Sequence, residues 1–276
     1  MVGERENISL DGKITSWREA DLSPAVLMGC NWVYTHINTL AHKPLHIELK
    51  LHHALESFCS LYGFRPTIDS TTLAKEIHDL LYYGLYPEGG NIVTLYLIPE
   101  GRESCRRLLM HEATTPYEGY GLLSVRPRGI IANYEIPFEK HQTNVSLTAA
   151  RFADNYATSH GYDIALRANR SGALLSAGDN PLFALRGNSL LTTPLDKGAR
   201  ESAERSLMFR LAEMCGVKMV EEELKVEDAA TYEELMIFTP AGVQSLMSVG
   251  NMKLSNIYAT LFGRHIATLS LQKFGK

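Results

Sequence analysis

The chain has 276 residues, of which 45% are hydrophobic and 21% charged, and 27 Lys and Arg against 31 Asp and Glu give a formal net charge of -4. This composition is typical of a soluble globular protein and excludes the disordered, collagen-like and disulfide-rich classes. The slight negative charge argues against nucleic acid as a partner, because binding to phosphates needs a basic face.

Targeting signals are also missing from the sequence. No apolar run reaches the roughly 18 residues of a membrane span, and the first ten residues, MVGERENISL, lack the apolar region of a secretory signal. The four cysteines are widely spaced and form no CxxC pair, so neither a zinc site nor a disulfide framework is expected. We therefore expect a cytoplasmic protein without a membrane partner.

The first third of the chain alternates between helical and strand patterns. Apolar residues three or four apart predict a helix over 47–62. A second helix is predicted over 71–83, with Ser70 as its N-cap. The β-branched and aromatic residues of 91–98 predict a strand that Pro99 closes.

The composition of the sequence changes between residues 117 and 137, where Tyr, Gly, Arg and Pro are mixed with a short apolar stretch. We predict a domain boundary here, with an N-terminal domain over 1–120 and a C-terminal domain over 121–276. The second half contains two helical patterns, 147–160 and 201–215, and four short strand patterns, 162–167, 173–175, 182–185 and 190–193. Mixed elements in both halves indicate the α+β class.

Five histidines occur in the first third: His36, His42, His46, His52 and His53. Pro44 makes a regular helix between His42 and His46 unfavourable, and the adjacent His52 and His53 point about 100° apart on a helix. We therefore expect no metal site. The sequence also contains no P-loop, no dinucleotide-binding GxGxxG and no GxSxG elbow.

Five segments of the second half carry a resemblance to a known family. In chain order they are ATSHGYDIAL (157–166), GALLSAGDNPLF (172–183), SLLTTP (189–194), RSLMFRLAEMCG (205–216) and ELMIFTPA (234–241). Their order and nearly gapless spacing resemble the class IV (fold type IV) pyridoxal-phosphate enzymes, which include branched-chain and D-amino-acid aminotransferases and aminodeoxychorismate lyase. The resemblance spans residues 142–247, with weaker similarity at 29–37 and 50–57.

The resemblance implies a two-domain fold of the D-amino-acid aminotransferase type. It consists of an N-terminal α+β domain and a C-terminal β-barrel-like domain with helices. The resemblance also implies a cofactor cleft between the domains and a homodimer.

At the family's catalytic positions this sequence departs from the pattern. The Schiff-base lysine position falls on Gln142, counted back without gaps from Gly161, although the chemistry needs an amine. The carboxylate that holds the proton of the pyridine nitrogen is replaced by Ser176.

The phosphate-binding positions also differ from the family. His53 stands at the position of the family's arginine, and Ser202, Ala203 and Glu204 replace its Gly-Ile-Thr turn. Thr239 and Pro240 replace its Gly-Thr pair. Glu204 adds a negative charge and Pro240 removes an amide donor.

The leading hypothesis is therefore a class IV aminotransferase homologue, a pseudoenzyme candidate, without ordinary pyridoxal-phosphate catalysis and without the cofactor. It would bind a small metabolite in the inter-domain cleft with the groups just named. A second hypothesis is an active transaminase or lyase that binds pyridoxal phosphate through Lys140, two residues before Gln142. A third is a non-catalytic dimer that binds another protein.

Overall fold

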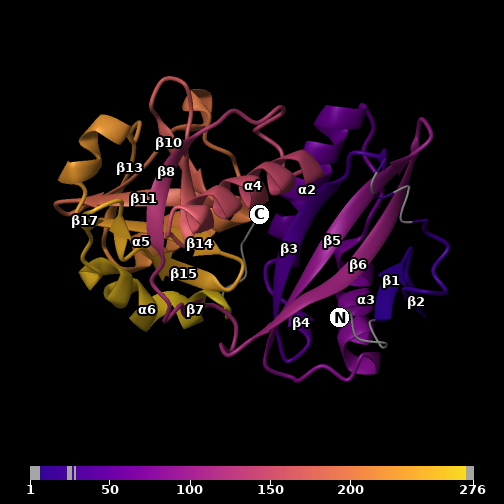
Figure 1. The fold of residues 1–276 in the computed structure, drawn as a ribbon. Coiled ribbons are helices and arrows are strands. Elements are labelled where there is room, and N and C mark those ends of the chain that lie inside the picture. The colour runs from indigo at the N-terminus through magenta and orange to yellow at the C-terminus, as the bar shows by residue number, and fades with distance from the viewer. Residues whose placement is uncertain (1–6, 24–26, 28, 272–276) are drawn as a thin grey trace. The chain divides into compact units, whose positions relative to one another are not determined.

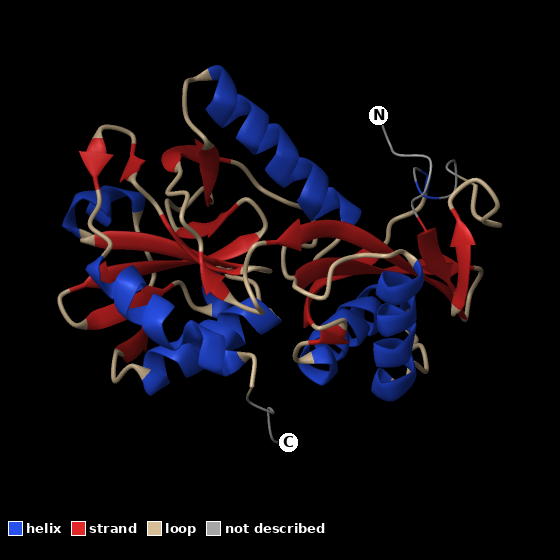
Figure 2. Ribbon diagram, turned by 90° about the horizontal axis from the view of Figure 1, so that it is seen from below, coloured by secondary structure: helices blue, strands red, loops and turns tan. Residues whose placement is uncertain are grey.

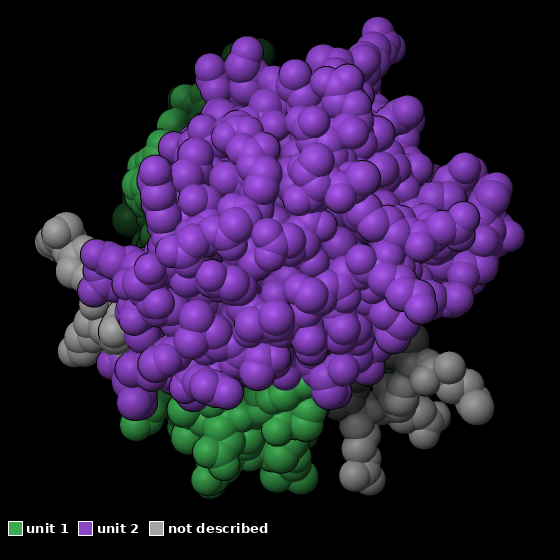
Figure 3. Space-filling model, turned by 90° about the vertical axis from the view of Figure 1, so that its left-hand side faces the viewer, with its two compact units in different colours: residues 1–119, 142–144, 272–276 green, residues 120–141, 145–271 purple. Residues whose placement is uncertain are grey.

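The structure, a computed structural model, describes residues 7–23, 27 and 29–271. The chain divides into two compact units, coloured separately in Figure 3. Unit 1 comprises residues 1–119, 142–144 and 272–276, and unit 2 comprises residues 120–141 and 145–271. Residues 142–144 thus belong with the first unit, whereas the sequence placed them in the second domain. The start of the chain, where a signal peptide was not expected, lies outside the described residues up to residue 6.

The described part of unit 1 forms one antiparallel sheet with two helices, α2 (Ile47–Tyr62) and α3 (Ser70–Tyr83). Its strands are β1 (Asn7–Leu10), β2 (Lys13–Ser16), β3 (Val33–Leu40), β4 (Lys43–Pro44), β5 (Gly90–Glu100) and β6 (Ser104–Thr115). They are ordered β2-β1-β6-β5-β3-β4. Both helices lie on the same face of this sheet (Figure 2). Phe58 of α2, Ile77 of α3 and Leu95 of β5 belong to the core they enclose.

Two local predictions for unit 1 need correction. Helix α3 is capped by Asp69 and not by Ser70, because the Asp69 carboxylate accepts a hydrogen bond from the Thr72 amide at 2.7 Å. Strand β5 continues through Pro99, which was expected to end it. The pairing of β5 with β3 ends at Leu97, so on that side the missing amide of Pro99 costs no ladder hydrogen bond.

Unit 2 is built on a larger, curled sheet (Figure 1). Its strands are β7 (Gly121–Leu122), β8 (Arg128–Asn133), β9 (Ile164–Ala168), β10 (Leu174–Ala177), β11 (Asn180–Arg186), β12 (Ser189–Thr192), β13 (Lys218–Glu221), β14 (Glu234–Thr239), β15 (Gly242–Ser245), β16 (Ser248–Val249) and β17 (Met252–Lys253). The path is β17-β16-β8-β9-β10-β11-β14-β15-β7, with β12 paired to β11 and β13 to β12.

Three α-helices and two short 3-10 helices complete this unit. They are α4 (Asn144–Ser159), α5 (Ala203–Met214), α6 (Ile257–Leu269), η1 (Leu195–Lys197) and η2 (Val226–Thr231). The helices predicted over 147–160 and 201–215 correspond to α4 and α5, and the four predicted strands to β9–β12. The two-domain α+β architecture expected from the resemblance is confirmed.

Two further observations concern membranes and thiols. Among the described residues, no helix has the length and apolar character needed to cross a membrane. The four cysteines are free and half-buried.

Candidate ligand-binding cavity of unit 2

Two of the predicted site residues, Ser176 and Ser202, line the same small cavity of unit 2. Its volume is about 20 Å³, which is room for roughly one water molecule. The other polar or charged residues that line it are Arg167, Asp179, Asn180, Arg200 and Arg205. Three of these seven groups are guanidinium groups, so this cavity has a charged lining.

Strand pairing and a helix cap place the serines. Ser176 lies on β10, opposite Arg167 on β9 in the antiparallel register. Ser202 is the N-cap of α5, and its hydroxyl accepts a hydrogen bond from the Arg205 amide at 3.2 Å. A serine at this position satisfies one of the first amides of the helix.

An ion-paired network occupies the wall around Ser176. The Arg167 side chain is only 3% exposed, and its Nη1 donates to Glu139 Oε2 at 2.9 Å. Arg200 pairs with Asp179, and its Nε donates to the Glu139 carbonyl oxygen at 3.0 Å. The hydroxyl of Ser146 donates to Asp179 at 3.3 Å. The network therefore joins β9, the β10–β11 turn, the first turn of α4, the segment before α5 and the segment after β8.

Arg205, at the start of α5, forms hydrogen bonds that stabilise the fold of unit 2. Its guanidinium donates to Thr192 Oγ1 at 2.8 Å and to Glu221 Oε1 at 2.5 Å. Burial lowers the pKa of Arg205, and the hydrogen bond to Glu221 opposes that shift. The carboxylate that pairs with Arg205 is thus that of Glu221.

One nitrogen of the cavity wall has an unused hydrogen-bonding capacity. Arg167 Nε is buried and has no hydrogen-bond partner within the described part of the chain. Because a buried donor without an acceptor is costly, this atom is a donor available to an acceptor in the cavity.

The remaining predicted residues of unit 2 lie elsewhere. Ala203 and Glu204 are buried in the first turn of α5 but do not line the cavity. Thr239 ends β14 and closes the turn to β15, since its hydroxyl donates to the Gly242 carbonyl oxygen and accepts from the Ala241 amide. Lys140 is exposed in the turn that follows Glu139.

His53 and Gln142 belong to unit 1. His53 is half-buried on α2. The carbonyl oxygen of Gln142 accepts a hydrogen bond from the Tyr34 amide at 3.1 Å, beside an isolated bridge between Val33 and Thr143. Their expected place in one site with Ser176 stays a prediction.

Three charged residues that line this cavity, Arg167, Asp179 and Arg200, were not predicted from the sequence, nor was Glu139, which pairs with Arg167. One signal was present in the sequence. Arg167 interrupts the apolar strand IALRA, and a charge inside a buried strand is rare unless it is paired. Among the described residues, no group of three or more His, Cys, Asp or Glu side chains could hold a metal ion.

Comparisons with known proteins define the fold. No protein-family model matches the chain, and no curated protein matches it. Solved structures do match over nearly the whole chain. The branched-chain amino acid aminotransferase from Escherichia coli has a TM-score of 0.81 at 15% identity, covering 97% of this chain and 95% of that one.

Two further solved structures match with a similar TM-score, identity and coverage. The branched-chain aminotransferase from Thermoproteus uzoniensis with norvaline has a TM-score of 0.80 at 16% identity and covers 95% of each chain. A hypothetical aminotransferase from Mycobacterium tuberculosis in a PLP-bound form has a TM-score of 0.80 at 13% identity, covering 96% of this chain and 99% of that one. The fold of this chain is therefore the class IV, fold type IV, aminotransferase fold, as the resemblance implied.

Proposed function

We propose that this chain retains the class IV aminotransferase fold but does not carry out pyridoxal-phosphate transamination, and that it acts by binding a small metabolite. The observation that supports this most is the pairing of Ser176 with Arg167 in a wall that ion pairs already fill. The fold neighbours are aminotransferases, one of them in a PLP-bound form, so the fit of this chain's residues to that cofactor is the central question.

The pyridine ring is the first point of poor fit. Its protonated nitrogen needs a carboxylate, whereas the resemblance assigns Ser176 to that position. The cross-strand neighbour of Ser176 is Arg167, whose guanidinium is 3% exposed. A buried cation beside this position disfavours a protonated ring nitrogen.

The Schiff base is the second point of poor fit. It requires a lysine amine inside the site, and the assigned residue, Gln142, carries an amide. Lys140 is the lysine nearest to that position in the sequence, and it is exposed in a turn.

Space is the third point. The cavity that Ser176 lines has a volume of about 20 Å³, so a substituted pyridine ring can enter unit 2 beside Ser176 only if this cavity is enlarged. Enlarging it means moving Arg200 or Asp179, whose side chains are 13% exposed and paired with each other. Leaving one buried charge without its partner costs about 3–5 kcal/mol, which would be subtracted from the binding free energy of the cofactor.

The proposal is tested by adding pyridoxal phosphate to the purified chain and recording the absorbance of a Schiff base. Borohydride reduction and peptide mass spectrometry then locate any adduct. An active class IV aminotransferase treated in parallel is the positive control. We expect no saturable, stoichiometric band, and a stoichiometric adduct on any single lysine would overturn the proposal.

An active enzyme with Lys140 is the second candidate, and one contact favours it. The neighbouring Glu139 accepts hydrogen bonds from Arg167 and Arg200, so the residue just before Lys140 is held by two side chains that line the cavity. This candidate requires that Lys140→Ala abolishes the adduct while circular dichroism is unchanged. An adduct that persists in this variant would eliminate Lys140.

The homodimer and the cytoplasmic location remain part of the proposal, on the strength of the sequence alone. Light scattering of the purified chain measures the first, and fractionation of cells measures the second. A stable hetero-complex that forms without any small molecule would favour the third reading, a protein-binding dimer.

A further inference from the structure

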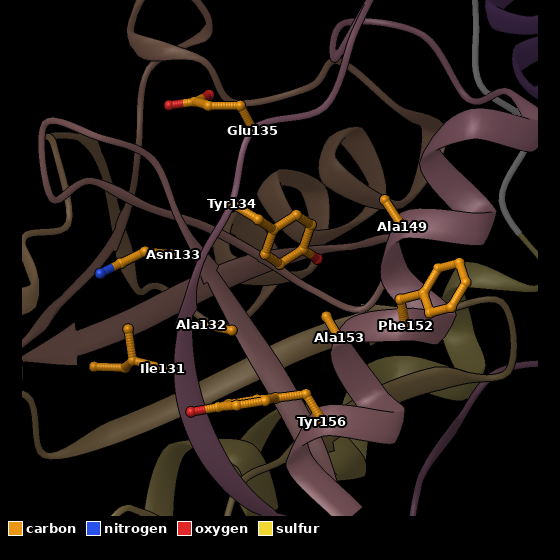
Figure 4. A pocket seen from close by; sticks show the side chains of 9 residues that line it. All are labelled: Ile131, Ala132, Asn133, Tyr134, Glu135, Ala149, Phe152, Ala153 and Tyr156. Carbon is orange, nitrogen blue, oxygen red and sulfur yellow. The ribbon is translucent and has the colours of Figure 1, made fainter.

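Unit 2 has a second and much larger cavity, about 640 Å³ in volume, between β8 and α4. Figure 4 shows its lining side chains, which come from β8, from the two residues that follow it and from one face of α4. We call it the β8–α4 slot. It shares no lining residue with the cavity around Ser176. Its volume falls within the range of small-molecule sites, roughly 300–1,000 Å³.

Small side chains create the slot. Helix α4 packs against β8 and β9 through alanines, with Ala153 and Ala157 in the same apolar cluster as Ala165. Ala132 of β8 and Ala149 and Ala153 of α4 line the slot, so the space between strand and helix is bounded by methyl groups. A larger residue at Ala149 would narrow it.

Aromatic side chains form several sides of this slot. Figure 4 shows Tyr134 above Ala132 and Ala153, and Tyr156 below them, reaching from α4 toward β8. Phe152 and Tyr156 are 71% and 46% exposed. The ring of Tyr156 contacts that of His160 with 4.1 Å between centroids, and a hydrogen bond of 2.8 Å joins His160 Nδ1 to the Tyr156 carbonyl oxygen. Tyr156 is therefore supported on the helix, and its π face can stack on a flat ring.

The polar groups of the slot set the charge that it accepts. Glu135 lines it, and no lysine, arginine or histidine is among its lining residues. One oxygen of Glu135 accepts a hydrogen bond from the Arg170 amide at 2.9 Å, and Figure 4 shows the carboxylate directed away from α4, so its negative charge acts on the slot from a distance and not by direct contact. Aromatic π faces also attract cations. Both features favour a positively charged ligand over an anionic one.

Tyr134 adds a buried hydroxyl that has no hydrogen-bond partner within the described part of the chain. Burial raises the pKa of Tyr134 to about 12, so the phenol is neutral at physiological pH. It therefore contributes no negative charge, and Glu135 is the charged group that lines the slot.

We propose that the β8–α4 slot binds a small, planar, positively charged aromatic molecule, which stacks on Tyr156 and is attracted by the negative charge of Glu135 at the far end of the slot. The inference goes beyond the proposed function, because the slot and the cavity around Ser176 are separate. It stands whether or not the chain binds pyridoxal phosphate.

The test uses two fluorescent probes of similar shape and opposite charge, proflavine as the planar cation and anthracene-2-sulfonate as the planar anion. Each is titrated with the full chain and followed by fluorescence anisotropy. We expect one saturable site for proflavine and binding of the sulfonate that is about tenfold weaker or undetectable. Equal binding of the two probes, or no saturable binding of proflavine, would overturn the proposal.

Variants then locate the site. Ala149→Leu narrows the slot with a good helix former and should weaken proflavine binding about tenfold. Thr148→Leu, at an exposed neighbouring position of α4, is the matched control and should bind as the parent does. Glu135→Gln keeps an acceptor for the Arg170 amide and should weaken the cationic probe alone.

A last control tests for adsorption to exposed aromatic residues. Tyr83 is 63% exposed on α3 of unit 1, so Tyr83→Ala should leave proflavine binding unchanged while Tyr156→Ala reduces it. Unfolding midpoints and circular dichroism establish that each variant is folded. If Tyr83→Ala reduces binding as much as Tyr156→Ala, or if Ala149→Leu has no effect, the slot is not the site.

Discussion

Ser176 lies opposite Arg167 across the antiparallel pair of β10 and β9, and the Arg167 guanidinium donates to Glu139 at 2.9 Å. The residue that the resemblance assigns to the pyridine carboxylate thus has a buried cation as its cross-strand neighbour. The positive charge of Arg167 is balanced by a side chain of the chain itself. This relationship links the strand register to the proposed loss of cofactor chemistry.

The first prediction concerns the stability that this pair contributes. Arg167→Gln leaves the half-buried Glu139, 29% exposed, without its cation. We expect the free energy of unfolding to fall by about 2–3 kcal/mol, less than for a fully buried pair because Glu139 is partly hydrated. Urea denaturation followed by circular dichroism measures the change.

The matched control is the exposed pair of Arg128 and Asp163, whose side chains are 51% and 49% exposed. Exposed ion pairs contribute little because water competes for both charges. Arg128→Gln should therefore destabilise the chain far less than Arg167→Gln. Equal losses would mean that the Arg167 network is not a stabilising element.

The local part of the fold could be predicted from the sequence. Apolar periodicity predicted the bounds of α2 as the structure has them. Ser176 and Ser202 line one cavity of unit 2, and their place in an inter-domain site stays a prediction. Helix α6 was missed because Gly263 interrupts its pattern. An added Cβ at Gly263 would lie 2.9 Å from Leu122, a tertiary contact that spacing along the chain cannot reveal.

The charged network was missed for a similar reason. Asp179 and Arg200 are 21 residues apart in the sequence, and Glu139 and Arg167 are 28 apart. Neither separation matches a helical or strand period, so only the folded sheet brings the partners together. The volume of the cavity likewise depends on how these side chains pack.

The second prediction concerns pH. Burial raises the pKa of Asp154 above its ordinary value of 3.8, although the Ala165 amide donates to it and opposes the shift. Folding therefore disfavours its ionised form, and stability is lost as the pH rises from 3.8 through the raised folded value. Asp154→Asn should be more stable than the parent at pH 7 and equal to it at about pH 3, as urea midpoints across this range will measure.

The effect of pH on stability should have the opposite sign for Asp163. Its hydrogen bonds with Arg128 hold its pKa below the ordinary value of 3.8, so its contribution is present above that value and is lost as the pH falls through the lowered folded value. Asp163→Asn should therefore be less stable than the parent at pH 7. The same sign for both variants would contradict this assignment.

The third prediction concerns Glu234, a fully buried carboxylate on β14 that caps α6 from outside the helix. It accepts hydrogen bonds from the amides of Tyr258 and Ala259 at 2.9 and 3.0 Å, and from the Ser255 hydroxyl at 3.1 Å. These amides are among those that a helix start leaves unpaired, where a negative charge is favourable. Glu234→Ala should reduce the free energy of unfolding by about 3 kcal/mol, measured in urea.

Two controls separate the cap from simple loss of volume. Glu234→Gln keeps one acceptor oxygen and should cost less than Glu234→Ala. Ser202→Ala removes an ordinary side-chain cap from α5 and should cost about 1 kcal/mol. If Ser202→Ala and Glu234→Ala are equally costly, the carboxylate adds nothing beyond a neutral cap.

The fourth prediction compares two glycines in the left-handed region. Gly242 has a φ of 130°, and an added Cβ would lie 2.1 Å from the Gly121 carbonyl oxygen, where β15 pairs with β7. Gly63 ends α2 with a φ of 77° and has nothing within 4 Å of an added Cβ. Gly63→Ala should cost about 1–2 kcal/mol through backbone strain alone.

Gly242→Ala must also separate two main-chain segments, because a backbone oxygen cannot rotate away as a side chain can. We expect a loss of about 3 kcal/mol or more, with increased hydrogen exchange at the Gly121 and Leu123 amides, which donate to Ala241 and Val243. Urea denaturation and exchange mass spectrometry measure the two effects. A loss no larger than that of Gly63→Ala, with unchanged exchange, would show that β7 can shift without cost and that strain alone selects glycine at this position.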